Sequence, residues 1–282
     1  MNIIIIFIII FILFNILNIY IFNLPEKNLY KEFFSQMHTE ENKIPLILYK
    51  TGPFTILPKY LKDTLNININ KLNIEKIIYF NNDDCKFFMK RLGKKYYDAY
   101  NMLIPNAFKA DLWRYCILYQ NGGIYGDLTQ YFLVNYDVNK ENVDMVFVKD
   151  ILKNDIQISF MASKKKSNFF KYVIDNITTN ILNKNKGNSV FDITGPRACA
   201  RNFLKFFSVN EIPLGINTLK GLDNNFYKIR IDMKQTNHNS FVDIYTNKDV
   251  VITKIKDHNN IITTAGNQPK YYTLYKNNKI FN

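Results

Sequence analysis

Residues 108–132 read FKADLWRYCILYQNGGIYGDLTQYF, and this stretch decides the fold. Its apolar spacing predicts a helix over about 107–120 that ends at Asn121-Gly122-Gly123, because glycine adopts the left-handed conformation that closes many helices. Ile124-Tyr125 begins a short strand, and Asp127 follows at the end of that strand. Open α/β sheets bind ligands at the carboxyl ends of their strands. The sequence therefore predicts that Asp127 lies at a ligand site.

The predicted helix carries a charged pair on one face. Asp111 and Arg114 are three residues apart, so their side chains are neighbours on a helix. Alone, such a pair indicates a surface ion pair that contributes about 0.2–1 kcal/mol. With Asp127 close by, the three groups suit a sugar nucleotide, since acids grip hydroxyls or a divalent cation and a guanidinium stabilises a leaving diphosphate.

The flanking segments predict the fold class. Short apolar runs bounded by turn residues predict strands, and apolar residues at helical spacing predict helices. The expected strands are 44–49, 76–80, 145–149 and 158–162, and the expected helices are 85–92 and 167–182. The early alternation of strand and helix favours an α/β fold with a mainly parallel sheet. Asp83-Asp84 is interpreted as a helix cap, because Asn and Asp bind free N–H groups at helix starts.

Composition restricts the class of protein. The chain has 282 residues, of which 47% are hydrophobic and 15% aromatic, so it can bury a large core and is not globally disordered. The formal net charge is +13, but the lysines are scattered rather than striped, so we expect no nucleic-acid partner. Cys85, Cys116 and Cys199 lie far apart without a CxxC pair, which argues against structural zinc and a disulfide scaffold.

The N-terminus predicts a membrane anchor. Residues 3–24 are apolar without a charge, and a helix needs roughly 20 such residues to span a bilayer. No basic residue precedes the run and no small-residue cleavage site follows it, which favours an uncleaved signal anchor over a signal peptide. We expect a single-pass protein of secretory-pathway or equivalent membranes, with an anchor over 1–24, a stem over 25–43 and a catalytic domain over 44–282.

The central stretch resembles a known signature. AFKADLWRYCILYQNGGIYGDLTQ is similar to A-x-x-x-D-x-x-R-Y-x-x-L-x-x-x-G-G-x-Y-x-D-x-D of DXD-containing glycosyltransferases, the sugar-binding-region group known as glycosyltransferase family 32. IPLILYKTGPF resembles the opening strand of that family, and YFNNDDCKFFMKRL resembles its second strand and helix. SFMAS and ITGPRACARNFL resemble later blocks, and YYTLYKNNKIF is a fainter C-terminal match.

This resemblance implies a GT-A fold and transfer of a hexose with retention of configuration, usually with Mn²⁺ or Mg²⁺. The donor would be a UDP- or GDP-hexose, and the acceptor a glycan or glycoconjugate. Asp111 and Arg114 would bind the donor sugar, and Thr51 would join the donor site. Asp127 would contact the donor and hold the metal together with Thr129. By the same resemblance, Asp111, Arg114 and Asp127 are the candidate catalytic residues.

Two departures from the signature keep alternatives open. Thr129 replaces the second acid of the DxD, which removes a charge that a hard divalent cation prefers, and Tyr49 stands where the family often has His. Lys50 or Arg197 could supply positive charge in place of a metal. Otherwise, catalysis is lost and the chain binds nucleotide or glycan without transfer. A third hypothesis is a basic, membrane-tethered protein that binds nucleic acid or anionic lipid.

The Thr194-Gly195-Pro196 segment has two interpretations. The family resemblance places it in a loop near the active site, whereas any Thr-Gly-Pro sequence can form an ordinary turn. The sequence leaves both open.

Overall fold

The structure is a computed structural model that describes residues 42–152, 154–237, 239–254 and 270–282. Residues 42–282 form one compact unit. The predicted anchor over 1–24 and all but the last two residues of the predicted stem lie outside the described residues. Within the described ranges, no helix combines the length and the apolar character needed to cross a membrane.

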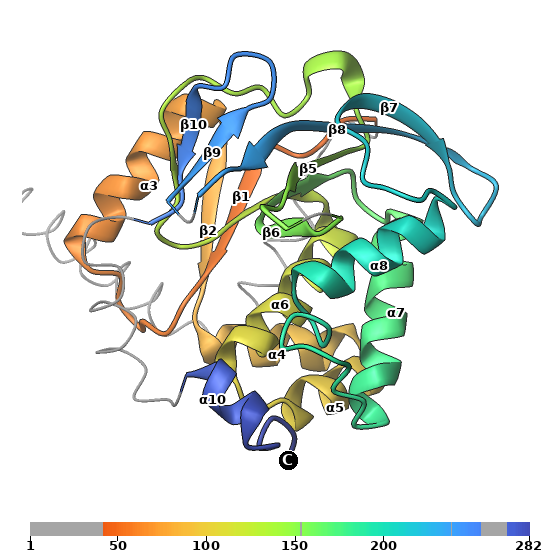
Figure 1. The fold of residues 1–282 in the computed structure, drawn as a ribbon. Helices are drawn as coiled ribbons and strands as arrows, with labels where there is room; N and C mark the ends of the chain where they lie inside the picture. The colour runs from red at the N-terminus through yellow and green to blue at the C-terminus, as the bar shows by residue number, and fades with distance from the viewer. Residues whose placement is uncertain (1–41, 153, 238, 255–269) are drawn as a thin grey trace, which may run out of the picture. The chain divides into compact units, whose positions relative to one another are not determined.

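A mixed set of strands and helices makes up this unit (Figure 1). The strands are β1 (Ile47–Thr51), β2 (Lys76–Phe80), β3 (Gly123–Gly126), β4 (Tyr131–Phe132), β5 (Met145–Lys149), β6 (Ile156–Ser163), β7 (Gly215–Lys220), β8 (Phe226–Gln235), β9 (Ser240–Asp243) and β10 (Asp249–Ile252). The helices are α3 (Lys59–Leu72), α4 (Asn82–Leu92), α5 (Lys94–Met102), α6 (Asn106–Asn121), α7 (Asn168–Leu182), α8 (Pro196–Phe206) and α10 (Tyr271–Lys276), with a 3₁₀ turn, η1 (Lys140–Asn142).

The α/β class is as expected, but the prediction of a mainly parallel sheet is wrong. The strand order is β2-β1-β3-β6-β5-β8-β9-β10-β4, with β7 also paired to β8. Only β1/β2, β1/β3 and β5/β8 are parallel among the described pairs, and the remaining pairs are antiparallel. The reason is the length of the connections: α3 crosses over between β1 and β2, whereas short turns join β5 to β6 and link β7 through β10, and a short turn can connect only antiparallel neighbours.

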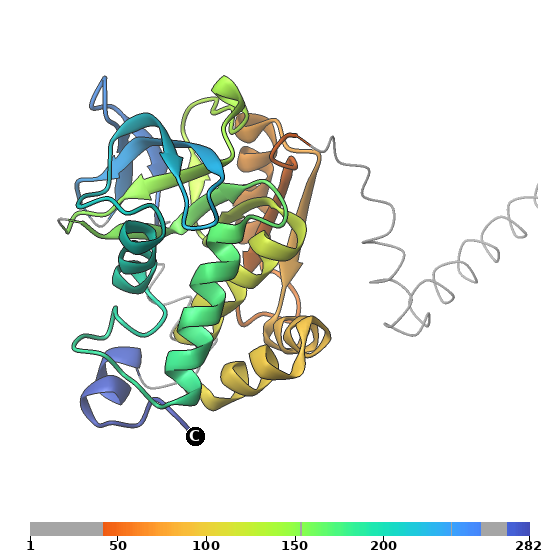
Figure 2. The same cartoon turned by 90° about the vertical axis from the view of Figure 1, so that its right-hand side faces the viewer.

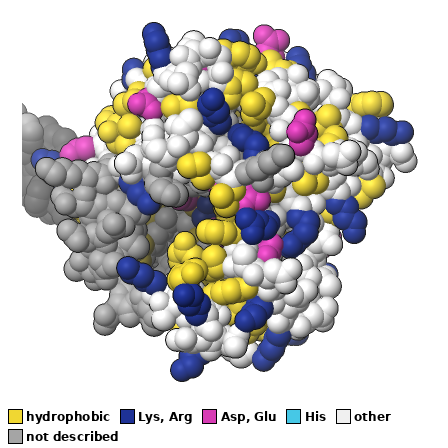
Figure 3. Space-filling model, viewed as in Figure 1, with side chains coloured by type: hydrophobic (Ala, Val, Ile, Leu, Met, Phe, Trp, Pro, Cys, Tyr) yellow, Lys and Arg dark blue, Asp and Glu magenta, His cyan; other side chains and the backbone are white. Residues whose placement is uncertain are grey.

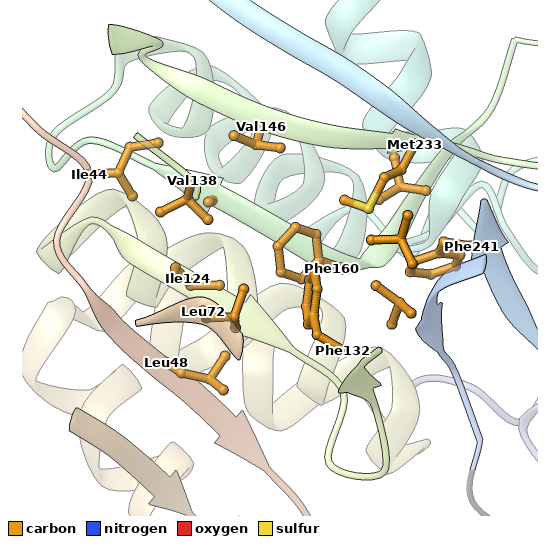
Figure 4. Close-up of a cluster of buried hydrophobic side chains, with 14 of the residues drawn as sticks. Ile44, Leu48, Leu72, Ile124, Phe132, Val138, Val146, Phe160, Met233 and Phe241 are labelled. Atoms are coloured by element: carbon orange, nitrogen blue, oxygen red, sulfur yellow. The ribbon is translucent and has the colours of Figure 1, made fainter. Parts of the chain in front are cut away.

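Alternating side chains of the strands build a core on each face of the sheet. Leu48 and Ile124 point to the face covered by α3, where they join Phe132, Phe160 and other buried residues (Figure 4). Because successive residues of a strand point to opposite faces, the side chains next to Leu48 and Ile124 enter the second core. This second core lies beneath α4 to α8, which form the helical layer in Figure 1.

The second core is aromatic and holds α6 against the sheet. Trp113 of α6 is fully buried, with its ring 5.0 Å from that of Phe80 and 6.3 Å from that of Tyr125. Phe147 of β5 packs its ring 5.8 Å from that of Phe203 of α8. Helix α10 packs on α6 through Phe108 and Tyr271, whose rings are 5.9 Å apart, and Figure 2 shows it at the lower end of the helical layer. The helix that carries Asp111 and Arg114 is therefore fixed from several sides.

Two local predictions are confirmed. Helix α4 begins with a capping box, in which the Asn81 side chain accepts from the N–H of Asp84 and the Asp84 carboxylate accepts from the N–H of Asn81. Helix α6 ends at Asn121, and Gly122 follows with φ +67° and Gly123 with φ +97°. Both values lie in the region that favours glycine, so this pair reverses the chain from α6 into β3.

Candidate functional site

A cavity of about 580 Å³ lies at the carboxyl ends of β3 and β5, within the size range of ligand sites. Its walls come from α6, β6, the loop before α8 and helix α10. Its polar and loop lining includes Asp111, Arg114, Asp127, Gln130, Asp150, Asp155, Gln157, Ser159, Gly195, Pro196, Gln235 and Tyr271. Lys and Arg side chains are spread over the face in Figure 3 rather than gathered in a stripe.

The three charged residues of the central stretch meet at this cavity. Arg114 Nη2 lies 2.9 Å from Asp111 Oδ1, and Arg114 Nη1 lies 3.3 Å from Asp127 Oδ1. The same guanidinium donates to the backbone oxygen of Ile158 at 2.8 Å and stacks 4.4 Å from the centre of the Tyr125 ring. The Arg114 guanidinium thus joins α6 to the end of β3 and to β6.

Burial and charge together set the ionisation of this cluster. Burial acts to lower the pKa of Arg114, but Tyr125, Asp111 and Asp127 outweigh it, so the pKa of Arg114 is raised and the guanidinium stays charged. Burial raises the pKa of Asp111, and Arg114 and the Thr194 hydroxyl counteract that shift. Without the guanidinium, Asp111 would therefore be a buried acid with little to keep it ionised.

Asp127 is the member of the cluster that is open to a ligand. Its side chain is 42% exposed, against 14% for Asp111 and 7% for Arg114. Asp127 Oδ1 accepts from the Tyr125 hydroxyl at 2.8 Å, and the Asp127 N–H donates to the Ser159 backbone at 2.9 Å. No described residue donates to Asp127 Oδ2, so this oxygen can accept from hydroxyls in the cavity.

The Thr194-Gly195-Pro196 segment lies at the same site. The Thr194 hydroxyl donates to Asp111 Oδ2 at 3.0 Å, and the Thr194 carbonyl accepts from the Tyr115 hydroxyl at 2.9 Å. Gly195 and Pro196 line the cavity, and Pro196 begins α8. The segment therefore holds the carboxylate of Asp111, in agreement with a loop near the site rather than an unrelated turn.

Two other predicted site residues, Thr129 and Thr51, do not line the cavity, and neither does Tyr49, the second departure from the signature. Thr129 is 1% exposed and its hydroxyl donates to the Thr253 carbonyl at 3.3 Å. The Thr51 hydroxyl donates to the carbonyl of Phe80 in β2 at 2.9 Å and lies 3.1 Å from the Sγ of Cys85 in α4. Tyr49 is fully buried in the aromatic core beside Phe80. The structure does not bring these three side chains to the acid–guanidinium cluster.

Lys50 and Arg197, the two candidate cations, lie on different sides of the acid–guanidinium cluster: Lys50 is under the loop after β3, and Arg197 is beside Asp155. Lys50 is 1% exposed, and its Nζ lies beneath the loop after β3, 2.8 Å from the Asp127 carbonyl oxygen. Burial lowers the pKa of Lys50 from 10.5 to about 7, and the nearby Asp127 acts in the opposite direction. Arg197 is paired with Asp155 at 3.3 Å on the opposite wall. Neither side chain replaces a metal beside Asp127 by direct contact with the cavity.

The opposite wall of the cavity was not predicted from the sequence. Asp150 follows β5, and its carboxylate accepts from the Leu152 N–H at 3.0 Å and from Gln157 Nε2 at 3.3 Å. Gln157 also donates to Gln235 Oε1 at 2.8 Å. Asp150 could have been predicted, because it directly follows the predicted strand 145–149. Ligands bind at the carboxyl ends of such strands, which is the reason that Asp127 was selected. Gln157 and Gln235 carry no comparable local signal.

The described residues do not by themselves fit a divalent cation. Asp127 Oδ2 is the one carboxylate oxygen of the cluster that no described residue contacts, while Arg114 lies against Oδ1 and Thr129 points to the Thr253 carbonyl. Among the residues that the structure describes, no three His, Cys, Asp or Glu side chains are grouped to hold a metal ion. Mg²⁺ and Ca²⁺ sites use six or more oxygen ligands in all, so most would have to come from outside these residues.

The chain was compared with solved structures, curated proteins and family models. Among solved structures, the chain is similar to "PaToxG Glycosyltransferase", with 16% sequence identity, a TM-score of 0.41, and coverage of 63% of this chain and 77% of that chain. No curated protein matches the chain. A family model described as "Glycosyltransferase sugar-binding region containing DXD motif" matches residues 57–143, from the segment before α3 to the segment after β4. The matched residues include Asp111, Arg114 and Asp127, and the match supports a glycosyltransferase.

Proposed function

We propose that this chain transfers a hexose from a UDP- or GDP-hexose to a glycan or glycoconjugate acceptor on a GT-A-type fold. The observation that carries the proposal is the meeting of Asp111, Arg114 and Asp127 at one wall of a 580 Å³ cavity. The family match over residues 57–143 contains all three residues. In this proposal, the cavity takes the donor sugar at the wall formed by α6 and β3.

Asp111 and Asp127 would bind the donor sugar, and Arg114 would position them. Arg114 already donates to Asp111, Asp127 and the Ile158 carbonyl, so its main task is to keep both carboxylates ionised and in place. An ionised carboxylate accepts about four hydrogen bonds, which leaves Asp111 and Asp127 capacity for sugar hydroxyls. Asp127, the more exposed acid, would make the closer contact.

Transfer with retention would follow from attack on the side that the leaving group vacates. The acceptor hydroxyl oxygen forms the new bond to the anomeric carbon, and the bond from that carbon to the diphosphate oxygen breaks with its electron pair on the diphosphate. The acceptor proton passes to a phosphate oxygen. The two carboxylates would stabilise the positive charge that develops on the sugar ring.

DXD-type glycosyltransferases generally use a divalent metal, and Mn²⁺ or Mg²⁺ is the cofactor we would add to the reaction. Asp127 would be its ligand from the described residues, and Thr129 would have to leave the Thr253 carbonyl to join it. Thr51 would reach the donor only through a change of its contact with Phe80. We also propose that residues 1–24 anchor the chain once in a membrane of the secretory pathway or an equivalent membrane.

The test is sugar release or transfer by the purified full chain in detergent, with a panel of UDP- and GDP-sugars. Each reaction is run with Mn²⁺, with Mg²⁺ and with EDTA, and Asp127→Asn serves as the matched inactive variant. We expect turnover with at least one donor, loss of turnover in Asp127→Asn, and retention of the anomeric configuration in the product. No turnover with any donor would contradict transfer.

The burial of Thr129 favours one second candidate, a chain that binds nucleotide or glycan without transfer. Calorimetric titration of the same donors separates the two candidates. Binding without turnover in every cation condition indicates the binding protein, whereas turnover removes it. Binding of nucleic acid or anionic lipid that falls steeply with salt and survives Asp127→Ala would instead indicate the basic, membrane-tethered protein.

A further inference from the structure

Lys50 is a buried lysine whose side-chain partners among the described residues all come from one loop, and its amine is a cation below its pKa of about 7. It is the last residue but one of β1, with 1% of its surface exposed. Its Nζ lies 2.8 Å from the Asp127 carbonyl oxygen, 3.3 Å from that of Gln130 and 3.5 Å from that of Gly126. We name residues 126–130 the donor loop, because this segment carries Asp127.

A buried ammonium group makes the position of this loop matter. Removing a charge from water is costly unless hydrogen bonds compensate for it, and Lys50 has three donors for three carbonyl oxygens. All three oxygens belong to the donor loop. A displacement of the loop would therefore leave a buried cation without partners, so Lys50 and the loop stabilise each other.

Other buried contacts hold the same loop. Asn68 of α3 is 1% exposed, donates to the Gln130 carbonyl at 2.8 Å and accepts from the Phe132 N–H at 3.1 Å. Gln130 Nε2 donates to the Ser159 hydroxyl at 2.8 Å. The loop is thus fixed from β1 and α3 by residues that do not line the cavity, and from β6 by Ser159, which does, while Asp127 itself lines the cavity.

We propose that Lys50 is a positioning residue, whose ammonium group holds the donor loop in its binding conformation before any donor or cation arrives. Thr129 gives the loop no second acid through which a metal could organise it, and the contacts of Lys50 come from the chain itself. That this loop binds a nucleotide-sugar rests on the proposed function above. The preformed loop and its dependence on Lys50 are independent of that function.

The first arm of the test uses the full wild-type chain with EDTA and no donor. Amide hydrogen exchange is measured at Asp127 and Gln130, whose N–H groups donate to the Ser159 and Asp127 carbonyls. We expect exchange at least about 100-fold slower than in an unstructured chain, since a preformed loop must open before these amides exchange. Unprotected amides at both positions would overturn the proposal without any variant.

The second arm compares Lys50→Met with Arg230→Met. Methionine keeps most of the length of the lysine side chain and removes its charge. Arg230 is also 1% exposed and donates to two loop carbonyls, those of Asp137 and Lys140, but it does not line the cavity. Both variants lose a buried cation, so the comparison separates a general loss of stability from an effect on the donor loop.

We expect Lys50→Met to raise exchange at Asp127 and Gln130 and the donor Kd by about 10-fold or more, because each hydrogen bond to a charged group contributes measurably. Arg230→Met should change both by less than about 2-fold, even if the melting temperatures fall equally. Unchanged exchange in Lys50→Met, or equal effects of both variants, would overturn the proposal. Lys50→Gln replaces Lys50→Met if that variant does not fold.

The two proposals fail in different ways. If no UDP- or GDP-sugar binds the wild type while exchange at Asp127 and Gln130 depends on Lys50, the function is wrong and the role of Lys50 stands. If a donor binds and exchange does not depend on Lys50, the role of Lys50 is wrong and donor binding stands.

Discussion

Arg114 Nη1 lies 3.3 Å from Asp127 Oδ1, so the middle of α6 and the end of β3 are joined through charge. The same guanidinium lies 2.9 Å from Asp111 Oδ1. Between the helix and the strand, the chain turns at Gly122-Gly123. The glycine pair therefore brings Asp127 back to the guanidinium that Asp111 already contacts, and the three side chains form one wall of the cavity.

Arg114→Met should destabilise the fold. The Arg114 side chain is 7% exposed, and its loss leaves the largely buried Asp111 carboxylate with a hydrogen bond from the Thr194 hydroxyl. Breaking a buried pair in this way costs about 3–5 kcal/mol of unfolding free energy. Urea unfolding followed by circular dichroism measures the change.

The double variant Arg114→Met/Asp111→Asn is the control for this mechanism. With the acid neutral, no uncompensated charge remains, so we expect the double variant to recover at least about 1 kcal/mol relative to Arg114→Met. A double variant that is less stable than Arg114→Met would show that the pair is not what makes the single change costly.

Asp127→Asn and Asp111→Asn should separate binding from stability. Asp127 is 42% exposed in its side chain, so its substitution should alter the free energy of unfolding by less than about 1 kcal/mol. Asp111 is buried between Arg114 and Thr194, and its substitution should cost about 2 kcal/mol or more. Both should weaken donor binding at least about 10-fold if the wall binds the donor. Calorimetry and urea unfolding on the same samples provide the two readouts.

Gly122→Ala should be among the most destabilising changes to alanine. At Gly122, φ is +67°, and an added Cβ would lie 2.6 Å from the Lys165 backbone nitrogen. The left-handed conformation alone costs an L-residue about 1–2 kcal/mol, and the close approach adds to that. Gly126→Ala is the matched control, because its Cβ would meet Leu48 Cδ1 at 3.5 Å, an ordinary contact. Equal loss of stability in both variants would contradict this account of the turn.

Local signals in the sequence predicted much of the first half of the fold. Strands 76–80 and 145–149 have the predicted bounds, and the helix predicted over 107–120 is observed over Asn106–Asn121. In each case an apolar run is closed by Gly, Asn or Asp, so the information lies within a few residues. The position of Asp127 followed from the same signals, since a strand end fixes which edge of the sheet a side chain occupies.

The remaining features depend on contacts between distant residues. The antiparallel half of the sheet was missed because the direction of pairing follows from connections such as the turn from β8 to β9, which composition does not reveal. Lys50 was one of two candidates to supply positive charge to the site, but it is buried under the donor loop, a rare position for lysine. Gln157 and Gln235 meet only after β5, β6 and β8 have paired.

Acid should weaken the contact between the β7–β8 turn and α7 through Asp223. Burial acts to raise the pKa of Asp223, but hydrogen bonds from Tyr227, Asn168 and Asn225 outweigh it and lower the pKa from 3.8 to about 2. A lowered folded-state pKa gives stability that is present above pH 3.8 and lost as the pH falls through about 2. Wild type should therefore lose more stability than Asp223→Asn between pH 5 and pH 2.5, as measured by urea midpoints. Equal losses in the two proteins would contradict this.

Thr129→Asp tests whether the missing acid can simply be restored. Thr129 is 1% exposed and its hydroxyl donates to the Thr253 carbonyl. An ionised carboxylate has no proton to donate there and would face an oxygen in a buried site, so we expect a loss of about 2–4 kcal/mol in the free energy of unfolding. Thr129→Ser, which keeps the hydroxyl, should stay within about 1 kcal/mol of wild type.

Mn²⁺ decides whether the new acid forms a metal site. A cation that binds only the folded variant, at 100 times its Kd, would raise the free energy of unfolding by about 2.7 kcal/mol. We expect 1 mM Mn²⁺ to raise the free energy of unfolding of Thr129→Asp by less than about 0.5 kcal/mol, because residue 129 does not line the cavity and its side chain is held at the Thr253 carbonyl. Urea unfolding with Mn²⁺ and with EDTA measures the difference. A larger increase in the free energy of unfolding, accompanied by Mn²⁺-dependent donor binding, would show that the side chain at position 129 can turn to the cavity and bind a metal together with Asp127.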